Sequence, residues 1–257
     1  MPRLKGLKSK ITLANFPCVD DGLQQFAEQM VYVTWSENFT WQVRTIGIIL
    51  PGQIKTFFES DLPQDLPSTS TPFLFLYPDK VSPTLDHLFA SDLMETTPSW
   101  RANIGISSET TSTSFQGEYP GNLIQVKKGT LFSFGPMVLA QTGLTTKFLL
   151  INLRAKPGNE PCRIKFGLLG QEKILKEAIV FQNSCSLVDL SGLCFDESEL
   201  IYACSDEITG IPLYFSHDHE FKKLSLEHSH PPTELLVFGN RAIFQNKIKL
   251  RWLGKKI

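Results

Sequence analysis

Residues 148–192 read FLLINLRAKPGNEPCRIKFGLLGQEKILKEAIVFQNSCSLVDLSG and carry the clearest fold signal in the chain. Apolar runs of strand length alternate here with turn formers, namely Lys156-Pro157-Gly158-Asn159 and Leu169-Gly170. Residues 162–168 also alternate between apolar and polar side chains, which is the pattern of a strand with one buried face. Short strands separated by such turns predict an antiparallel β architecture.

The same pattern extends over most of the chain beyond Trp100. Strand-like segments recur there at a spacing of about ten residues, with few helical crossovers between them. Those before the first stretch are residues 101–106, 112–117 and 123–135. The stretch 148–192 is similar in architecture to immunoglobulin-like and jelly-roll modules. We therefore expect a mainly β protein with an antiparallel β-sandwich or jelly-roll-like fold.

The first third of the chain mixes strand and helix patterns. Residues 31–35 and 39–52 are rich in β-branched and aromatic side chains, and they predict a hairpin joined near Ser36 to Asn38. Helical spacing of apolar residues predicts two short helices as well. One follows Asp20-Asp21 through Leu23, Phe26, Ala27 and Met30, and the other follows Ser82-Pro83 through Leu85, Leu88, Phe89 and Met94.

These patterns predict two parts along the chain. Residues 1–98 form an α+β segment with the hairpin and a linker rich in Pro, Ser and Thr at 60–72. Residues 99–257 form a β-sandwich domain that carries a histidine-rich hairpin. One continuous domain is the alternative.

Composition indicates a globular chain without a membrane span. The 257 residues are 42% hydrophobic and 20% charged, and no apolar run approaches the length of a membrane helix. The basic start MPRLKGLKSKITL lacks a following apolar segment, so we expect a cytoplasmic, soluble protein. Five cysteines at irregular spacing favour reduced thiols over a disulfide framework.

Basic residues are concentrated at the two termini. The first ten and last eleven residues hold nine of the 25 basic residues and no acidic one, which leaves 16 basic against 26 acidic residues between them. Such short basic ends are usually solvated, so nucleic acid is not an expected partner. The basic residues are Arg3, Lys5, Lys8, Lys10, Lys247, Lys249, Arg251, Lys255 and Lys256.

Four of the five histidines form a cluster, His217, His219, His228 and His230, in the segment FSHDHEFKKLSLEHSHPPTE. On a strand, the two histidines of an H-x-H pair point to the same face, so each pair is a candidate metal site. His228 and His230 share their face with Leu224 and Leu226. A hairpin would put His217 and His219 at a solvated tip, ~15–20 Å from the second pair, so one four-histidine site is not expected.

The segment His228-Ser229-His230-Pro231-Pro232-Thr233-Glu234 has the spacing H-x-H-x-x-x-E and resembles the first metal motif of the cupins. The resemblance implies that His228, His230 and Glu234 bind a divalent transition metal. The chain departs from the cupin pattern because two prolines follow His230, Gly239 comes too early and no histidine remains for a second motif. A pair of hydrogen-bonded histidines that closes a sheet is the structural alternative.

A second candidate site is the loop around residues 114–122, SFQGEYPGN. Gln116, Glu118 and Tyr119 combine there with Arg101 upstream, and this set of an aromatic ring, a cation and polar groups is typical of sugar-binding loops. A plain turn is the commoner explanation for such a loop.

Two hypotheses of function follow, and whether the chain is an enzyme stays open. The first is a β-sandwich binding or accessory module for a small molecule, a glycan or a protein partner. The alternative is a cytosolic metal-dependent enzyme that uses His228 and His230 as ligands or acid and base groups, with Glu234, Glu118 or His87 as a third ligand. Glu227, His228 and His230 are its candidate catalytic residues. Signatures of serine hydrolases, NTPases, dinucleotide-binding proteins and zincins are missing from the sequence.

Overall fold

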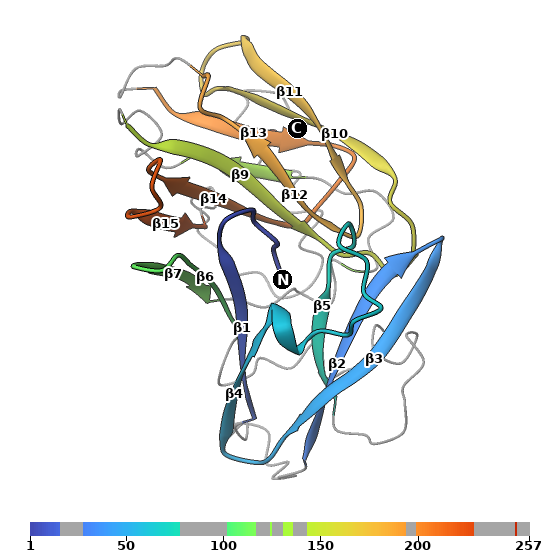
Figure 1. The fold of residues 1–257 in the computed structure, drawn as a ribbon. Coiled ribbons are helices and arrows are strands. Elements are labelled where there is room, and N and C mark those ends of the chain that lie inside the picture. The colour runs from blue at the N-terminus through green and yellow to red at the C-terminus, as the bar shows by residue number, and fades with distance from the viewer. Residues whose placement is uncertain are drawn as a thin grey trace, which may run out of the picture. The chain divides into compact units, whose positions relative to one another are not determined.

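The computed structural model describes residues 1–15, 28–77, 102–116, 124, 131–135, 143–193, 199–228 and 250. These residues form fifteen strands in four antiparallel sheets, which confirms the mainly β prediction (Figure 1). The chain divides into two compact units, the first comprising Met1–Gly121 with Ala155–Gly158 and the second Asn122–Arg154 with Asn159–Ile257. No helix among the described residues has the length and apolar character needed to cross a membrane.

The prediction of two short helices in the N-terminal third is not borne out. Where the first predicted helix reaches described residues, Gln29 and Met30 begin a strand, because they continue the β-branched and aromatic run that follows them. The rest of both predicted helices lies outside the described residues.

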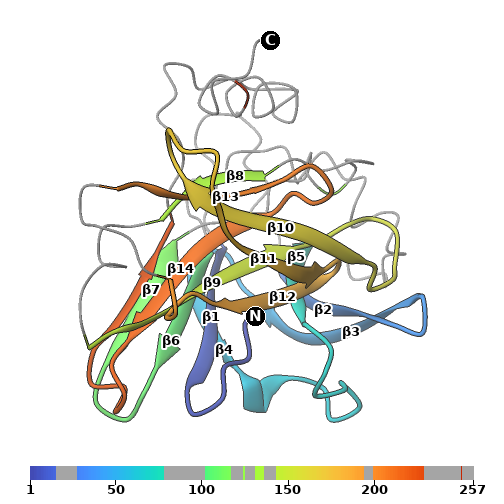
Figure 2. The ribbon, with the colours of Figure 1, turned by 90° about the horizontal axis from the view of Figure 1, so that it is seen from above.

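The first unit contains two sheets. Sheet A has the order β4-β1-β6-β7, and sheet B has the order β3-β2-β5 (Figure 2). The strands of sheet A are β1 (Lys8–Asn15), β4 (Gln53–Phe58), β6 (Asn103–Ser107) and β7 (Ser112–Gln116). Those of sheet B are β2 (Gln29–Glu37), β3 (Thr40–Ile49) and β5 (Phe73–Tyr77), and the short 3-10 turn η1 (Glu59–Asp61) follows β4.

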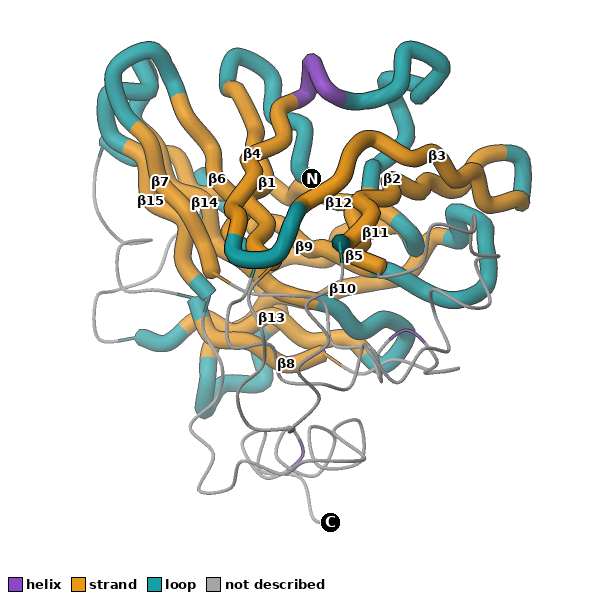
Figure 3. The backbone as a smooth tube through the Cα atoms, turned by 90° about the horizontal axis from the view of Figure 1, so that it is seen from below, coloured by secondary structure: helices purple, strands orange, loops and turns teal. Residues whose placement is uncertain are grey.

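The predicted hairpin is present as β2 and β3, which pair from Gln29 opposite Ile49 to Glu37 opposite Thr40 (Figure 3). Asn38 and Phe39 form its turn with φ values of 49° and 58°. Two left-handed residues in a row are the requirement of the tight turns that match the twist of a hairpin. Asn adopts this backbone readily, whereas Phe39 does so at a cost in strain.

Part of the basic start of the chain forms strand β1 of sheet A. Ser9, Ile11, Leu13 and Asn15 are buried, and the alternating residues from Lys8 to Ala14 face the other way. The Asn15 side-chain amide donates a hydrogen bond of 2.9 Å to the carbonyl of Ile49, which ties the end of β1 to β3. Lys8 and Lys10 therefore lie on a strand that is paired within a sheet.

The second unit contains two four-stranded antiparallel sheets. Sheet C has the order β11-β10-β13-β8, and sheet D has the order β12-β9-β14-β15. Four of these strands lie in the stretch 148–192 or overlap it, as predicted. The strands are β8 (Leu131–Phe134), β9 (Thr145–Asn152), β10 (Pro161–Leu168), β11 (Ile174–Phe181), β12 (Ser184–Asp189), β13 (Ile201–Ser205), β14 (Ile211–His217) and β15 (Leu224–Glu227).

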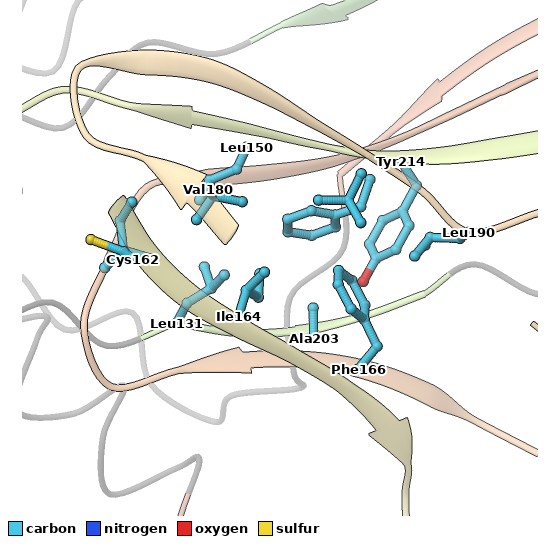
Figure 4. Close-up of a cluster of buried hydrophobic side chains, with 12 residues drawn as sticks. Leu131, Leu150, Cys162, Ile164, Phe166, Val180, Leu190, Ala203 and Tyr214 are labelled. Atoms are coloured by element: carbon cyan, nitrogen blue, oxygen red, sulfur yellow. The ribbon is translucent and has the colours of Figure 1, made fainter. Parts of the chain in front are cut away.

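The core of the second unit lies between sheets C and D (Figure 4). Phe148 makes edge-to-face contacts with Phe166 and Tyr214, each with 5.3 Å between ring centroids. Full burial of one such aromatic or aliphatic side chain stabilises the fold by about 2 kcal/mol. Burial also raises the pKa of Tyr214 strongly, so its hydroxyl stays protonated. The contact between Phe148 and Tyr214 joins β9 to β14, one of the two strands of the histidine-rich hairpin.

Side chains close the edge where β11 leads into β12. Lys176 donates from Nζ to the carbonyl of Asp189 at 2.7 Å, and the Ser186 hydroxyl accepts from the backbone N–H of Phe181 at 2.9 Å. Edge strands with unpaired backbone groups invite association with other chains. These two bonds satisfy one backbone carbonyl and one backbone N–H at that edge, and they connect sheets C and D within the unit.

Candidate functional site

The predicted histidine-rich hairpin is formed by β14 and β15. The two strands pair from Tyr214 opposite Glu227 to His217 opposite Leu224, and residues 218–223 form the loop. Asp218 organises this loop, since its carboxylate accepts the backbone N–H of Lys223 at 3.0 Å. Backbone hydrogen bonds of this kind lower the pKa of Asp218, because they stabilise the carboxylate.

His217 is buried, which makes the prediction of a solvated tip wrong for this residue. Its exposed fraction is 7%, and its ring stacks on Phe215 at 5.2 Å and lies 4.7 Å from Phe221. Phe221 reaches this position because its backbone is left-handed, with φ of 54°. The apolar Phe221 within an otherwise polar loop was the sequence signal for this burial. His219 is exposed, as predicted.

The hydrogen bonding of His217 is one-sided. Its Nδ1–H donates to the carbonyl of Asp218 at 2.8 Å, whereas no described residue reaches the buried Nε2. Among the described residues, His217 belongs to no group of three or more side chains that could hold a metal ion.

His228 directly follows β15, whose alternation would place it on the same side as Leu224 and Leu226. Leu226 is buried and His228 is half-buried, in line with the predicted alternation. The Nδ1–H of His228 donates to the carbonyl of Pro212 at 2.7 Å. Burial lowers the pKa of His228, and the bond to Pro212 opposes that shift only in part.

Glu227 faces the opposite side of β15 from His228, since successive residues of a strand alternate. Its carboxylate accepts a hydrogen bond of 2.8 Å from the hydroxyl of Ser225, two residues earlier on the same side. The described geometry thus separates Glu227 from His228, the two members of the predicted catalytic set that can be seen.

No metal centre is evident in the part of the chain that the structure describes, because no three candidate ligands converge there. His217 and His228 are four residues apart in register on the same face, which is ~13 Å at strand spacing and too far for a shared ion. His230 and Glu234, the other two predicted ligands, lie outside the described residues, as does His87. The metal site stays a prediction.

The second predicted site begins at Gln116, which is exposed at the end of β7. Gln116 pairs with Asn103 at the start of β6. Arg101, Glu118 and Tyr119 lie outside the described residues, so only one of the four predicted ligand-binding residues is seen. Strand β7, which ends at Gln116, belongs to sheet A, and the outward face of that sheet was not part of the predicted site.

The outward face of sheet A is a polar surface laid out by the strand register. Its residues form rows across β4, β1, β6 and β7, and we call this set the polar face of sheet A. One row is Phe58, Lys10, Gly105 and Ser114; the next is Thr56, Thr12, Asn103 and Gln116; and a partial row at the other end is Lys8, Ser107 and Ser112.

Hydroxyl and amide groups dominate the polar face. Thr12 and Thr56 share a hydrogen bond of 2.9 Å, and the Asn103 amide donates to the Ser114 hydroxyl at 3.3 Å. No strand of sheet A contains Asp or Glu. The face therefore presents hydrogen-bonding groups and positive charge without a carboxylate from its own strands.

An apolar border runs along β4 at one side of this face. Ile54 is 52% exposed and Phe58 is 47% exposed. Large apolar side chains at this exposure on an edge strand contribute flat contact area rather than core packing. The sequence signal for the whole face was the alternation in KSKITLAN and STSFQ, which marks Lys8, Lys10, Ser112 and Ser114 as outward.

Comparisons with known proteins add nothing to this geometry, because no protein family, curated protein or solved structure matches the chain.

Proposed function

We propose that the chain is a non-catalytic β binding module that recognises a glycan on the polar face of sheet A. The observation that carries the proposal is the row structure of that face, in which hydroxyl and amide groups lie beside exposed Phe58 without a carboxylate from the sheet's own strands. An antiparallel sheet can leave one face in water, and that face is then available to a ligand.

The chemistry of the face suits a sugar. Asn103 and Gln116 each supply an amide that can donate and accept, and the hydroxyls of Thr12 and Ser114 do the same on a smaller scale. The ring of Phe58 can cover the apolar side of a sugar while the polar groups bind its hydroxyls. Gln116 links this surface to the ligand-binding loop that the sequence predicts.

The second candidate function is the metal-dependent enzyme, and one observation favours it. The bond from His228 Nδ1–H to the carbonyl of Pro212 fixes the ring in the manner of metal-ligating histidines, whose second nitrogen is usually held by a carbonyl or carboxylate. The same bond is equally expected for a structural histidine at a strand end. The glycan-binding proposal is stronger because its residues are assembled on one face.

A glycan array probed with purified protein tests the proposal. We expect specific glycans to be retained by the wild-type chain and lost by a double variant, Asn103→Ala with Gln116→Ala. The matched control is Gln53→Ala, because Gln53 lies on β4 of the same sheet but at a position of the opposite face. Retention of no glycan would overturn the proposal, as would equal retention by the double variant. A partner recovered by pull-down without any glycan signal would favour a protein ligand instead.

A further inference from the structure

We infer that the glycan is acidic, bearing uronate carboxylates, and that Lys10 is the residue on the polar face of sheet A that contacts a carboxylate. This inference rests on the proposed glycan-binding function. The sequence predicts that the basic beginning of the chain is solvated, whereas in the structure Lys8 and Lys10 are part of β1.

Lys10 lies flat on the sheet rather than extending into solvent. A Cβ atom added at Gly105 would come within 2.7 Å of Lys10 Cε and 2.9 Å of Lys10 Cγ. The aliphatic stem therefore crosses β6 at the one outward position of that strand that has no side chain. A side chain at this position would force the lysine stem to shift.

The direction of the stem places positive charge among hydrogen-bonding groups. Gly105 pairs with Lys10 on one side and with Ser114 on the other, so a stem that crosses Gly105 leads from β1 toward β7. Phe58 is the neighbour of Lys10 on the remaining side. The ring of Phe58, the ammonium group of Lys10 and the hydroxyl of Ser114 thus follow one another across a single row of the sheet.

The charge of this face has no internal partner among the described residues. No carboxylate there forms an ion pair with Lys10 or Lys8, and sheet A contributes no acidic residue from its strands. Lys8 lies two residues from Lys10 on the same face, which is ~7 Å along the strand. Two unpaired cations at this spacing complement an anionic ligand.

The pattern favours sparse carboxylates over dense sulfate or phosphate groups. The face has no arginine, the side chain whose planar fork binds doubly charged oxyanions most effectively. Two lysines among seven hydroxyl and amide side chains suit a polymer with about one charge for each sugar. A uronate-bearing glycan has that composition.

The test compares the affinities of immobilised polygalacturonate, unsubstituted dextran and poly-glutamate for the wild type and three variants. Lys10→Gln removes the charge, and Gly105→Ala displaces the lysine stem while it keeps every charge. Lys55→Gln is the matched control, because it removes the same charge from β4 of the same sheet at a position of the opposite face. Circular dichroism and thermal unfolding establish that each variant is folded.

We expect polygalacturonate to bind, and Lys10→Gln to weaken that binding about tenfold or more, as loss of a charge-assisted hydrogen bond does. Gly105→Ala should weaken it as well, and Lys55→Gln should leave it unchanged. Higher salt should reduce the affinity of the wild type more than that of Lys10→Gln.

Four results would overturn the inference, and the last of them would also overturn the proposed function. Retention of neutral glycans alone on the array, with no effect of Lys10→Gln, would leave glycan binding intact and refute the acidic ligand. Equal losses in Lys10→Gln and Lys55→Gln would show unspecific charge attraction. Poly-glutamate that binds as tightly as polygalacturonate would identify the carboxylate, not the sugar, as the whole ligand. Retention of no glycan would refute the proposed function and the inference together.

Discussion

The stem of Lys10 lies directly over Gly105, so a basic residue at the start of the chain reaches across a strand that comes almost a hundred residues later. Neither residue is notable in the sequence by itself. The antiparallel pairing of β1 with β6 gives both a role, because it puts an ammonium group on a face of hydroxyls and amides.

The position of Gly210 in the second unit leaves no room for a side chain. A Cβ atom at this position would collide with the backbone carbonyl of Ile151, and backbone cannot move aside as a flexible side chain does. We expect Gly210→Ala to lower the free energy of unfolding by about 1–3 kcal/mol. Urea unfolding measures this change. Gly192→Ala is the control, since no atom lies within 4 Å there, and a loss as large in the control would contradict the explanation.

The aromatic core of the second unit should be sensitive to truncation. Phe166 is fully buried and packs edge-to-face on Phe148, so Phe166→Ala removes a large side chain and leaves a cavity. The expected loss of stability is about 3–5 kcal/mol. Ile179→Ala on the neighbouring strand should cost little, because Ile179 is 54% exposed. Similar losses of stability for the two variants would argue against this core.

His228 should make the stability of the fold depend on pH. Its pKa is lowered by burial, so the folded state disfavours the protonated ring. The contribution of His228 to the free energy of unfolding is therefore complete above its unfolded-state pKa near 6.5. It is lost as the pH falls through the lower folded-state pKa of this residue. We expect wild-type stability to fall as the pH drops below the unfolded-state pKa near 6.5. His228→Asn should reduce that fall, and an unchanged pH profile in urea titrations would contradict this prediction.

Asp189 should give a second pH effect at lower pH. Its carboxylate accepts bonds from the hydroxyl and the backbone N–H of Ser191, and these bonds lower the pKa of Asp189. Stability from this group is present above the unfolded-state pKa near 3.8 and is lost as the pH falls through the lower folded-state pKa. Asp189→Asn should therefore be less stable than the wild type at pH 7, and the difference should vanish in strong acid. A difference that persists there would exclude this cause.

The metal hypothesis makes its own prediction. If His228, His230 and Glu234 bind an ion, purified wild-type protein should contain a divalent transition metal that is lost in the double variant His228→Ala with His230→Ala. Elemental analysis after exhaustive dialysis measures it. Equal and negligible metal in both proteins would refute the site and leave His228 as a structural residue.

The sequence predicted those elements whose pattern is local. The β2 and β3 hairpin follows from a run of β-branched and aromatic residues, and the β9 to β12 stretch follows from strands separated by clear turns. The sequence pattern of Gln29 and Met30 predicts a helix because a short apolar run fits either period. Their pairing with β3, and that of Met30 with β5, makes them part of a strand.

The candidate site could be predicted only in part, because its residues meet through long-range pairing. Gln116 was identified from its loop, whereas Lys10 and Asn103 join it only through the register of β1, β6 and β7. The burial of His217 was missed for a different reason. It depends on the left-handed backbone at Phe221, which propensity does not foresee for an aromatic residue.

The affinity of the best retained glycan for Ser114→Ile tests most directly whether the polar face of sheet A is the ligand surface. Ser114 is exposed in the row that contains Lys10, so a bulky apolar side chain there obstructs the face without a change in charge. Thr45→Ile adds the same side chain at an exposed position of β3 in sheet B. We predict at least a tenfold loss of affinity for Ser114→Ile and none for Thr45→Ile. Equal affinities of both variants and the wild type would contradict the account.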